Sequence, residues 1–316
     1  MWKVARSYAL RGSPSLIGIG KETGVIGEAG TYFDVRLSPD ETKLAFASGA
    51  TSDIWVDELA RGVRMCLTID PGSDHGHPVW SPDGSRILFG AFQGKVRSGI
   101  YQKPSNGAGG EELLQSAETS DPQLWPSSCS RDGRFILYLR IDFSDLNPGI
   151  WILPLAGEGK PRLLVKAPVK ASDGQFSPDD RWVAYASRES GREEVYVVPF
   201  EAANVLKSGT ESVTSPEGKW QISPGGGRSP RWRRDGKEIF YLDPGNEIMA
   251  AEVEVRGNSL EVRKALPLFR AAVAGFFSPY DVTPDGKRFV INTTTDSTNK
   301  SLTLVVNWTA LLDNKR

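Results

Sequence analysis

The sequence predicts an all-β protein, and three observations support this prediction. The first is a turn motif of the form Ser-Pro-Asp-Gly, in which proline presets φ, aspartate bonds the backbone and glycine accepts a positive φ. The second is that short runs of β-branched and aromatic residues flank the motif, as in a β-hairpin. The third is repetition, because six copies carry an aspartate at positions 40, 83, 132, 179, 235 and 285. These aspartates are 43 to 56 residues apart, a period typical of β-propeller blades.

Each repeat unit is interpreted as a four-stranded antiparallel blade. The first strand ends in the turn motif and the second follows it, whereas the fourth has the weakest pattern. No amphipathic helix competes with this interpretation. We therefore predict one six-bladed β-propeller domain over residues 1–316, with blades at about 31–72, 73–119, 120–169, 170–226, 227–271 and 272–310. An aromatic residue precedes the motif in three copies and is expected in the core between blades: Trp80, Phe176 and Trp232.

The two ends of the chain are expected to complete the propeller. The last unit lacks a fourth strand, whereas strand-like segments at 15–20 and 24–28 precede the first motif. An open propeller would expose a sheet edge. We therefore expect residues 1–30 to pair with the C-terminal blade and close the ring. The alternative is seven blades, with residues 1–30 forming a partial blade that includes a strand at 4–10.

Composition narrows the class of partner. A hydrophobic content of 39% suits a sizeable core, and a net charge of -1 gives no reason to expect nucleic acid. The basic run at 228–234 is interpreted as a solvated turn and strand edge.

Cys66 and Cys129 occupy different positions in their repeats, which argues against a structural disulfide. No apolar run reaches the roughly 18 residues of a membrane helix, and no signal peptide is recognised. The chain as given is therefore expected in the cytoplasm.

Several segments, in addition to the turn motif, resemble those of a known protein family. They lie at 36–40, 53–55, 175–185, 193–200, 230–238 and 305–309. On these residues the chain resembles the TolB-like (WD40-like) β-propellers. More specifically, it is similar to the propellers fused C-terminally to bacterial serine/threonine protein kinases. The resemblance runs from about Ser15 to the C-terminus. It implies a sensor or protein-binding role, and a location outside the cytoplasmic membrane, in the periplasm, if a membrane-anchored kinase domain precedes this chain.

Four copies of the motif depart from its consensus. Glu41 and Asp180 stand where other copies have glycine, and Arg131 and Arg234 replace the proline. Because a side chain is strained at positive φ, we expect these copies to use a different turn type or a longer loop.

The sequence contains no recognised catalytic motif. It has no Gly-x-Ser-x-Gly elbow, no kinase motif and no phosphate-binding loop. No catalytic residue, cofactor or metal is therefore assigned, and enzymatic activity is not expected. The alternative function is a metal-dependent lyase or hydrolase that uses the His75–His77 segment, because alternate residues of an extended segment point the same way.

The central channel is the predicted binding site. Innermost strands of a propeller start or end at the channel, and ligands commonly bind in such concave places. We therefore predict a non-catalytic sensor or scaffold that recognises a protein, peptide or small polar ligand at the channel mouth, without membrane insertion. A scaffold that uses blade edges instead of the channel is a further alternative. The predicted ligand-binding residues precede the turn motifs: Tyr32, Asp34, Arg36, His75, His77, Trp125, Asp173, Gln175, Arg228, Arg231, Tyr280 and Asp281.

Overall fold

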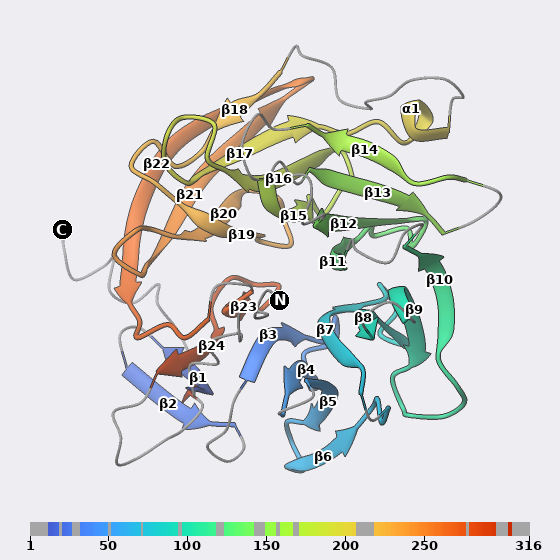
Figure 1. Cartoon of the computed structure of the whole chain (residues 1–316). Helices are drawn as coiled ribbons and strands as arrows, with labels where there is room; N and C mark the ends of the chain where they lie inside the picture. Colours follow the sequence, from blue (N-terminus) through green and yellow to red (C-terminus); the bar gives the residue numbers. More distant parts are fainter. Residues whose placement is uncertain are drawn as a thin grey trace, which may run out of the picture.

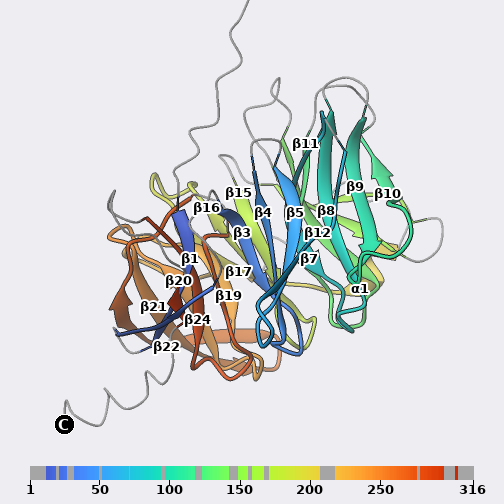
Figure 2. The same ribbon diagram turned by 90° about the horizontal axis from the view of Figure 1, so that it is seen from below.

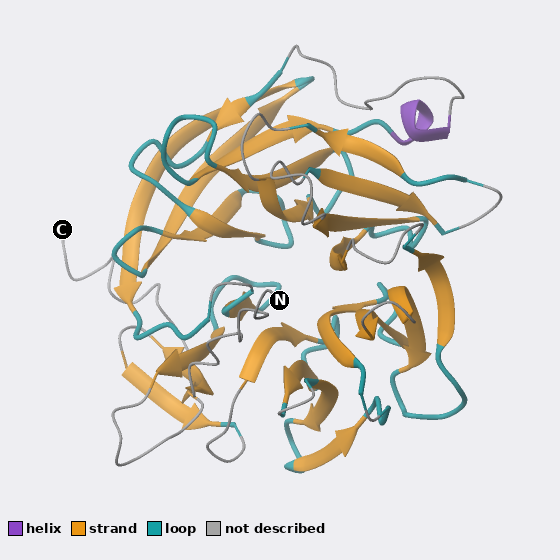
Figure 3. Ribbon diagram, in the orientation of Figure 1, coloured by secondary structure: helices purple, strands orange, loops and turns teal. Residues whose placement is uncertain are grey.

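The structure is a computed structural model, built almost entirely of β-strands (Figure 3). It describes residues 12–18, 21–26, 32–49, 52–70, 72–93, 97–117, 123–141, 149–155, 159–166, 171–206, 218–275, 278–294 and 303–304. One short helix, α1 (Ala202–Leu206), occurs within these ranges. No helix in them has the length and apolar character that crossing a bilayer requires.

Five four-stranded antiparallel blades make up most of the molecule. In each blade the strands pair in chain order from the innermost to the outermost. The first two blades are β3 (Tyr32–Leu37), β4 (Lys43–Ser48), β5 (Asp53–Glu58) and β6 (Val63–Cys66), followed by β7 (Asp74–Trp80), β8 (Arg86–Gln93), β9 (Arg97–Pro104) and β10 (Glu112–Ser116). The third is β11 (Gln123–Cys129), β12 (Phe135–Ile141), β13 (Ile150–Pro154) and β14 (Arg162–Val165). The fourth and fifth are β15 (Ala171–Phe176), β16 (Trp182–Ser187), β17 (Glu194–Pro199) and β18 (Trp220–Gln221), then β19 (Arg228–Trp232), β20 (Glu238–Leu242), β21 (Glu247–Arg256) and β22 (Ser259–Arg270).

The remaining strands form one five-stranded sheet from both ends of the chain, here called the terminal sheet. Its strands, in spatial order, are β2 (Lys21–Val25), β1 (Gly12–Gly18), β25 (Thr303–Leu304), β24 (Phe289–Thr294) and β23 (Tyr280–Val282). β1 also pairs antiparallel with β24, from Gly12 opposite Thr294 to Ile17 opposite Phe289.

The expectation of six four-stranded blades, or of seven, is therefore wrong. Five blades have four strands, and the last sheet differs because two N-terminal strands are added to it. The strand expected at 4–10 lies outside the described residues, as does most of the expected C-terminal strand.

The innermost strands surround a common axis (Figure 1). Contacts link each of them to the next, in the order β3, β7, β11, β15, β19 and β23, and β23 also contacts β3. In the view turned by 90°, the strands β7, β8 and β9 of one blade stand side by side (Figure 2). Contacts between innermost strands thus bring together residues that are far apart in the sequence.

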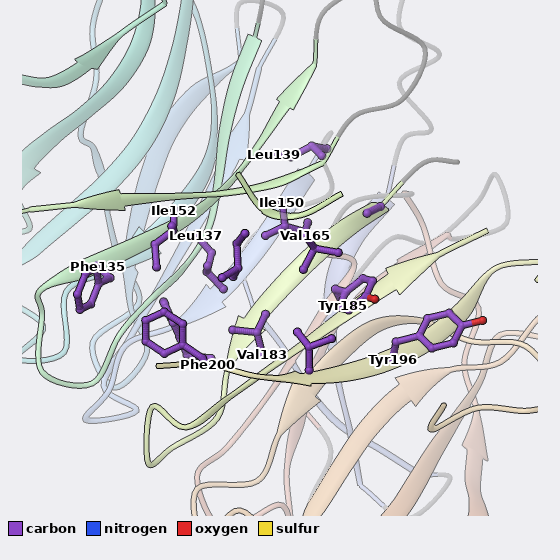
Figure 4. Packing of buried hydrophobic residues seen from close by; sticks show 14 of the residues in the cluster. Phe135, Leu137, Leu139, Ile150, Ile152, Val165, Val183, Tyr185, Tyr196 and Phe200 are labelled. Atoms are coloured by element: carbon purple, nitrogen blue, oxygen red, sulfur yellow. The ribbon is translucent and has the colours of Figure 1, made fainter. Parts of the chain in front are cut away.

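Apolar side chains between neighbouring blades form the core. In the largest cluster, Leu137 and Ile150 of the third blade pack with Val183 and Tyr185 of the fourth (Figure 4). Burial of such a side chain contributes about 1.5–3 kcal/mol. Of the aromatic residues before the motif, Trp80 and Phe176 are each 7% exposed, whereas Trp232 is half-buried.

All six turn motifs have the same backbone hydrogen bond, so the expectation of a different turn in the variant copies is wrong. At the glycine position, Gly84 N–H donates to Ser81 O at 2.9 Å, and Glu41 and Asp180 make the equivalent bonds at 2.9 and 3.0 Å. Glu41 and Asp180 adopt φ values of 62° and 54°. Contacts with neighbouring turns offset this strain, because Asp180 accepts hydrogen bonds from the backbone N–H groups of Arg131 and Asp132, at 2.9 and 3.2 Å. Glu41 forms an ion pair with Arg288.

Candidate functional site

The innermost strands share an unusual backbone conformation six residues before the aspartate of the turn motif. In four blades a residue other than glycine has a positive φ there: Asp34 (53°), His77 (57°), Asp173 (56°) and Ser229 (54°). Beside each of these residues, the pairing with the second strand shifts register. A left-handed conformation costs such a residue about 1 kcal/mol or more, and a bulge re-aims its side chain. Polar side chains from four blades are thus turned away from the regular alternation of their strands.

The buried Asp34 and the partly buried His77 form a pair between the first two blades. The Nδ1 atom of His77 lies 3.2 Å from Oδ2 of Asp34, whose side chain is 5% exposed. The backbone N–H of His77 donates to the same oxygen at 3.3 Å. The imidazole stacks on Trp125 with 4.4 Å between ring centroids. Burial lowers the pKa of His77, although Asp34 opposes the shift, and burial raises the pKa of Asp34. Burial thus favours the neutral form of both groups.

Two buried arginines lie near this pair. Nη2 of Arg36 donates to Ser278 Oγ at 2.5 Å, and Nη1 of Arg231 donates to Pro230 O at 2.7 Å. Nε of Arg231 is 3.5 Å from Oδ1 of Asp281. Burial, followed by repulsion from Arg231, lowers the pKa of Arg36 to about 10. Two like charges are thus held close together where water is largely excluded.

Asp173 joins these pairs into one group. It lies on β15, across the axis from β3, yet its charge acts on Asp34, Arg36 and His77. Its Oδ2 accepts a hydrogen bond from Ser229 Oγ at 3.3 Å. We call the group that meets here the central cluster: Asp34, Arg36, His77, Asp173, Arg231, Tyr280 and Asp281.

Tyr280 and Asp281 connect the terminal sheet to this cluster. The hydroxyl of Tyr280 donates to Ser229 O at 2.8 Å, and burial raises the pKa of that hydroxyl. The Arg231 guanidinium lies 5.7 Å from the centre of the Tyr280 ring. Oδ2 of Asp281 accepts a hydrogen bond from Leu37 N at 2.8 Å. The terminal sheet is thereby tied to both β19 and β3.

Four predicted site residues have structural partners outside the cluster. Tyr32 is buried and its hydroxyl accepts a hydrogen bond from Arg64 at 3.1 Å. Gln175 donates to the Ser127 carbonyl at 2.7 Å, which links two blades. Arg228 donates to Asn246 at 2.9 Å. The fourth residue, His75, is separated from His77 by the bulge.

The hypothesis that His75 and His77 point the same way is wrong. The imidazole of His75 is buried, with Nδ1 3.3 Å from Asp53 Oδ1 and an edge contact to Phe89. His77 instead contacts Asp34, because its positive φ breaks the alternation of side chains along β7. Within the described ranges, no three histidine, cysteine, aspartate or glutamate side chains converge as metal ligands.

Sequence reasoning missed Ser229 and Ser278. Ser229 stands six residues before Asp235, the same offset that Asp34, His77 and Asp173 have from their own turn aspartates. That constant offset was the available signal. It fails for Ser278, which precedes its turn aspartate by seven residues and has a φ of 41°.

Comparison with known proteins yields the fold. No protein-family model and no curated protein matches the chain. Putative TolB from Agrobacterium tumefaciens is 18% identical with a TM-score of 0.63, over 90% of this chain and 99% of that one. The chain has the fold of a TolB-like β-propeller. TolB from Acinetobacter baumannii is 16% identical with a TM-score of 0.55, and the match covers 87% of this chain but 58% of that protein.

Enzymes share the same TolB-like fold. A gluconolactonase from Xanthomonas campestris is 12% identical with a TM-score of 0.59, over 91% of this chain and 95% of that one. The shared fold therefore does not decide whether this chain is an enzyme, and function depends on the residues of the site.

Proposed function

We propose that this TolB-like chain is a non-catalytic binding propeller that recognises a protein, peptide or small polar ligand through the central cluster. The proposal includes closure of the ring by the pairing of β1 with β24. Closure would keep β23, which carries Tyr280 and Asp281 of the central cluster, beside β3. Guanidinium donors, carboxylates and an aromatic ring together suit a polar ligand.

The observation that carries the proposal is the incomplete pairing of Arg231. Its side chain is 5% exposed, and among the described residues its Nη2 atom has no hydrogen-bond partner. The Asp281 oxygen nearest to its guanidinium is 3.5 Å away. Arg64 provides the contrast, because Asp57 meets it with two hydrogen bonds of 2.7 Å. An incompletely paired buried guanidinium is costly, and a polar ligand would supply the missing acceptor.

A triple variant of the central cluster tests this function. We expect Arg36→Gln, Arg231→Gln and Asp281→Asn together to abolish ligand binding, because the variant loses both guanidinium groups and their carboxylate. The measurement is the melting temperature in a panel of amino acids, dicarboxylic acids and dipeptides. At least one compound should stabilise the wild type by several degrees and leave the triple variant unchanged.

The matched control changes two exposed arginines outside the cluster, Arg61→Gln and Arg86→Gln. This control should respond to the panel as the wild type does. If every compound that stabilises the wild type stabilises the triple variant equally, the channel is not the site. A scaffold role for the blade edges would then replace the proposal.

A second candidate function is enzymatic, and the His77–Asp34 pair is the observation that favours it. A carboxylate that orients an imidazole is a common general-base arrangement. The fold is shared with a gluconolactonase, so hydrolysis of gluconolactone by the wild type and by His77→Asn is the direct assay. Zinc or nickel titration of the wild type and of His77→Ala tests the metal-dependent form. Turnover or metal binding lost in these variants would favour the enzyme.

We also propose that the chain is the sensor part of a longer polypeptide with an N-terminal serine/threonine kinase domain and a membrane anchor. The proposal rests on the resemblance of segments 36–40, 175–185 and 230–238 to kinase-linked propellers. The coding sequence upstream of Met1 tests it directly. A stop codon without a kinase domain there would contradict it.

A further inference from the structure

A cleft opens among the turn motifs of the third, fourth and fifth blades, away from the central cluster. Its volume is about 540 Å³, and its lining includes Arg131, Pro178, Trp182, Trp232 and Arg234. This volume is typical of binding pockets, which hold about 300–1,000 Å³. We call it the turn cleft.

The turn cleft coincides with a departure from the repeat. Four copies of the motif keep proline after the first residue, at positions 39, 82, 178 and 284. The two copies that have arginine instead contribute Arg131 and Arg234, and both arginines line this cleft. The turn keeps its backbone hydrogen bond in both copies, with Gly133 bound to Ser130 and Gly236 bound to Arg233 at 2.9 Å. The substitutions therefore add positive charge without altering the turn.

Trp232 forms an apolar wall of the cleft and is less buried than the aromatic residues at the same repeat position in other blades. Trp80, at the same position in the second blade, is buried, and its Nε1 donates to Arg36 O at 3.0 Å. Trp232 is only half-buried, and its Nε1 has no hydrogen-bond partner within the described chain. Trp182, Val253 and Val255 complete the apolar surface of the cleft.

Most of the charged side chains that line the cleft without an ion pair among the described residues are positive. Arg131, Arg234 and Lys237 are exposed, and among the described residues none of them has an ion pair. Nη1 of Arg131 donates to the Pro178 carbonyl at 3.2 Å, which holds this side chain over the neighbouring turn.

Two of the four carboxylates that line the cleft, Asp235 and Glu254, are paired with cations. Asp235 accepts two hydrogen bonds from Arg233, at 2.7 and 2.8 Å. Glu254 is paired with Arg256 and Arg263. Asp179 accepts hydrogen bonds from the Ser177 hydroxyl and the Arg181 backbone N–H. Asp179 and Glu252 have no ion pair among the described residues, so three cations line the cleft together with two carboxylates that lack a cation partner.

We propose that the turn cleft binds an extended acidic peptide segment of a partner protein, with one apolar side chain seated against Trp232. Carboxylates of the peptide meet Arg131, Arg234 and Lys237, whose guanidinium and ammonium groups are good partners for them. A nucleic acid fits less well, because its closely spaced phosphates need more cations than the three that line the cleft, and the whole chain has a net charge of -1. This site is independent of the central cluster.

Selection from a display library tests the proposal. The wild-type protein is panned against random peptides of about seven residues, a length that suits recognition of an extended segment. We expect enrichment of Asp and Glu together with one aromatic or aliphatic residue. The best peptide, labelled with fluorescein, should bind about tenfold or more weakly to Arg131→Gln/Arg234→Gln, because two charge contacts are lost. Trp232→Phe should weaken binding while retaining the dependence on salt.

Three results would overturn the proposal. One is a selection that yields no acidic preference. Another is a peptide that binds Arg131→Gln/Arg234→Gln as tightly as it binds the control Arg61→Gln/Arg86→Gln, which also loses two exposed arginines. The third is a single-stranded oligonucleotide that binds more tightly than the selected peptide and loses affinity in Arg131→Gln/Arg234→Gln. Melting curves of all variants establish that each is folded.

Discussion

At the scale of single residues, burial shifts the pKa values of Asp34 and His77 in the directions that favour their neutral forms. Burial lowers the pKa of His77 and raises that of Asp34, and their mutual attraction opposes both shifts. An unfolded histidine titrates near about pH 6.5. Because the folded state resists protonation of His77, its contribution to stability is present above that pH and is lost as the pH falls. Asp34 acts in the opposite sense, since its raised pKa gives stability at low pH that is lost as the pH rises.

His77→Asn isolates the first effect, because asparagine tolerates the positive φ at this position. We expect the stability difference between wild type and variant to shrink between about pH 7.5 and about pH 5, as the unfolded wild type gains a proton on His77. Urea unfolding at both pH values measures the difference. Because the chain has two histidines, His75→Asn is measured in the same way, which separates the contribution of His75 from that of His77. A difference that is constant with pH would show that His77 titrates normally.

At the scale of the element, the turn motif is held together by its first side chain. Ser177 Oγ accepts hydrogen bonds from the backbone N–H groups of Trp182 and Arg181, at 3.0 and 3.2 Å, and donates to Asp179 at 2.6 Å. Ser81 Oγ likewise accepts from Arg86 N at 2.9 Å. The motif could be recognised in the sequence because these bonds are local.

Ser177→Ala should lower the free energy of unfolding by about 1–3 kcal/mol, because it removes the acceptor of the buried Trp182 N–H, whereas the Arg181 N–H keeps Asp179 as an acceptor. Denaturant unfolding measures this change. Ser190→Ala is the control, since the exposed Ser190 hydroxyl makes one hydrogen bond, to the Arg192 carbonyl. That control should stay within about 0.5 kcal/mol of the wild type. Equal effects of the two variants would mean that the motif needs only its backbone hydrogen bond.

At the scale of the whole molecule, the terminal sheet joins the two ends of the chain. β24 lies between β23 and the added strands, so removal of β1 exposes a long edge of backbone donors and acceptors. β23 would then be held beside β3 mainly by side-chain bonds such as that from Arg36 to Ser278.

Deletion of residues 1–30 should therefore lower the melting temperature by about 10 °C or more, as expected for a loss of several kcal/mol. Deletion of residues 1–11 is the control, because it retains β1 and β2 and should have a smaller effect. Thermal unfolding followed by circular dichroism compares both with the full chain. If the variant that lacks residues 1–30 has the same melting temperature as the full chain, ring closure by these strands is refuted.

The sequence alone determined the features that depend on neighbours along the chain. The turn motif, its flanking strands and the spacing of the copies follow from local hydrogen bonds and short-range patterning, so they predicted an all-β propeller and placed Asp34, Arg36, Arg231 and Asp281 on innermost strands. Only the tertiary structure decided which of these residues meet. The bulges turn His77 away from His75 and toward Asp34, the inter-blade packing brings Arg231 near Arg36, and the N-terminal strands make the last sheet five-stranded. Each of these depends on contacts between residues tens to hundreds of positions apart, for which a local pattern carries no signal.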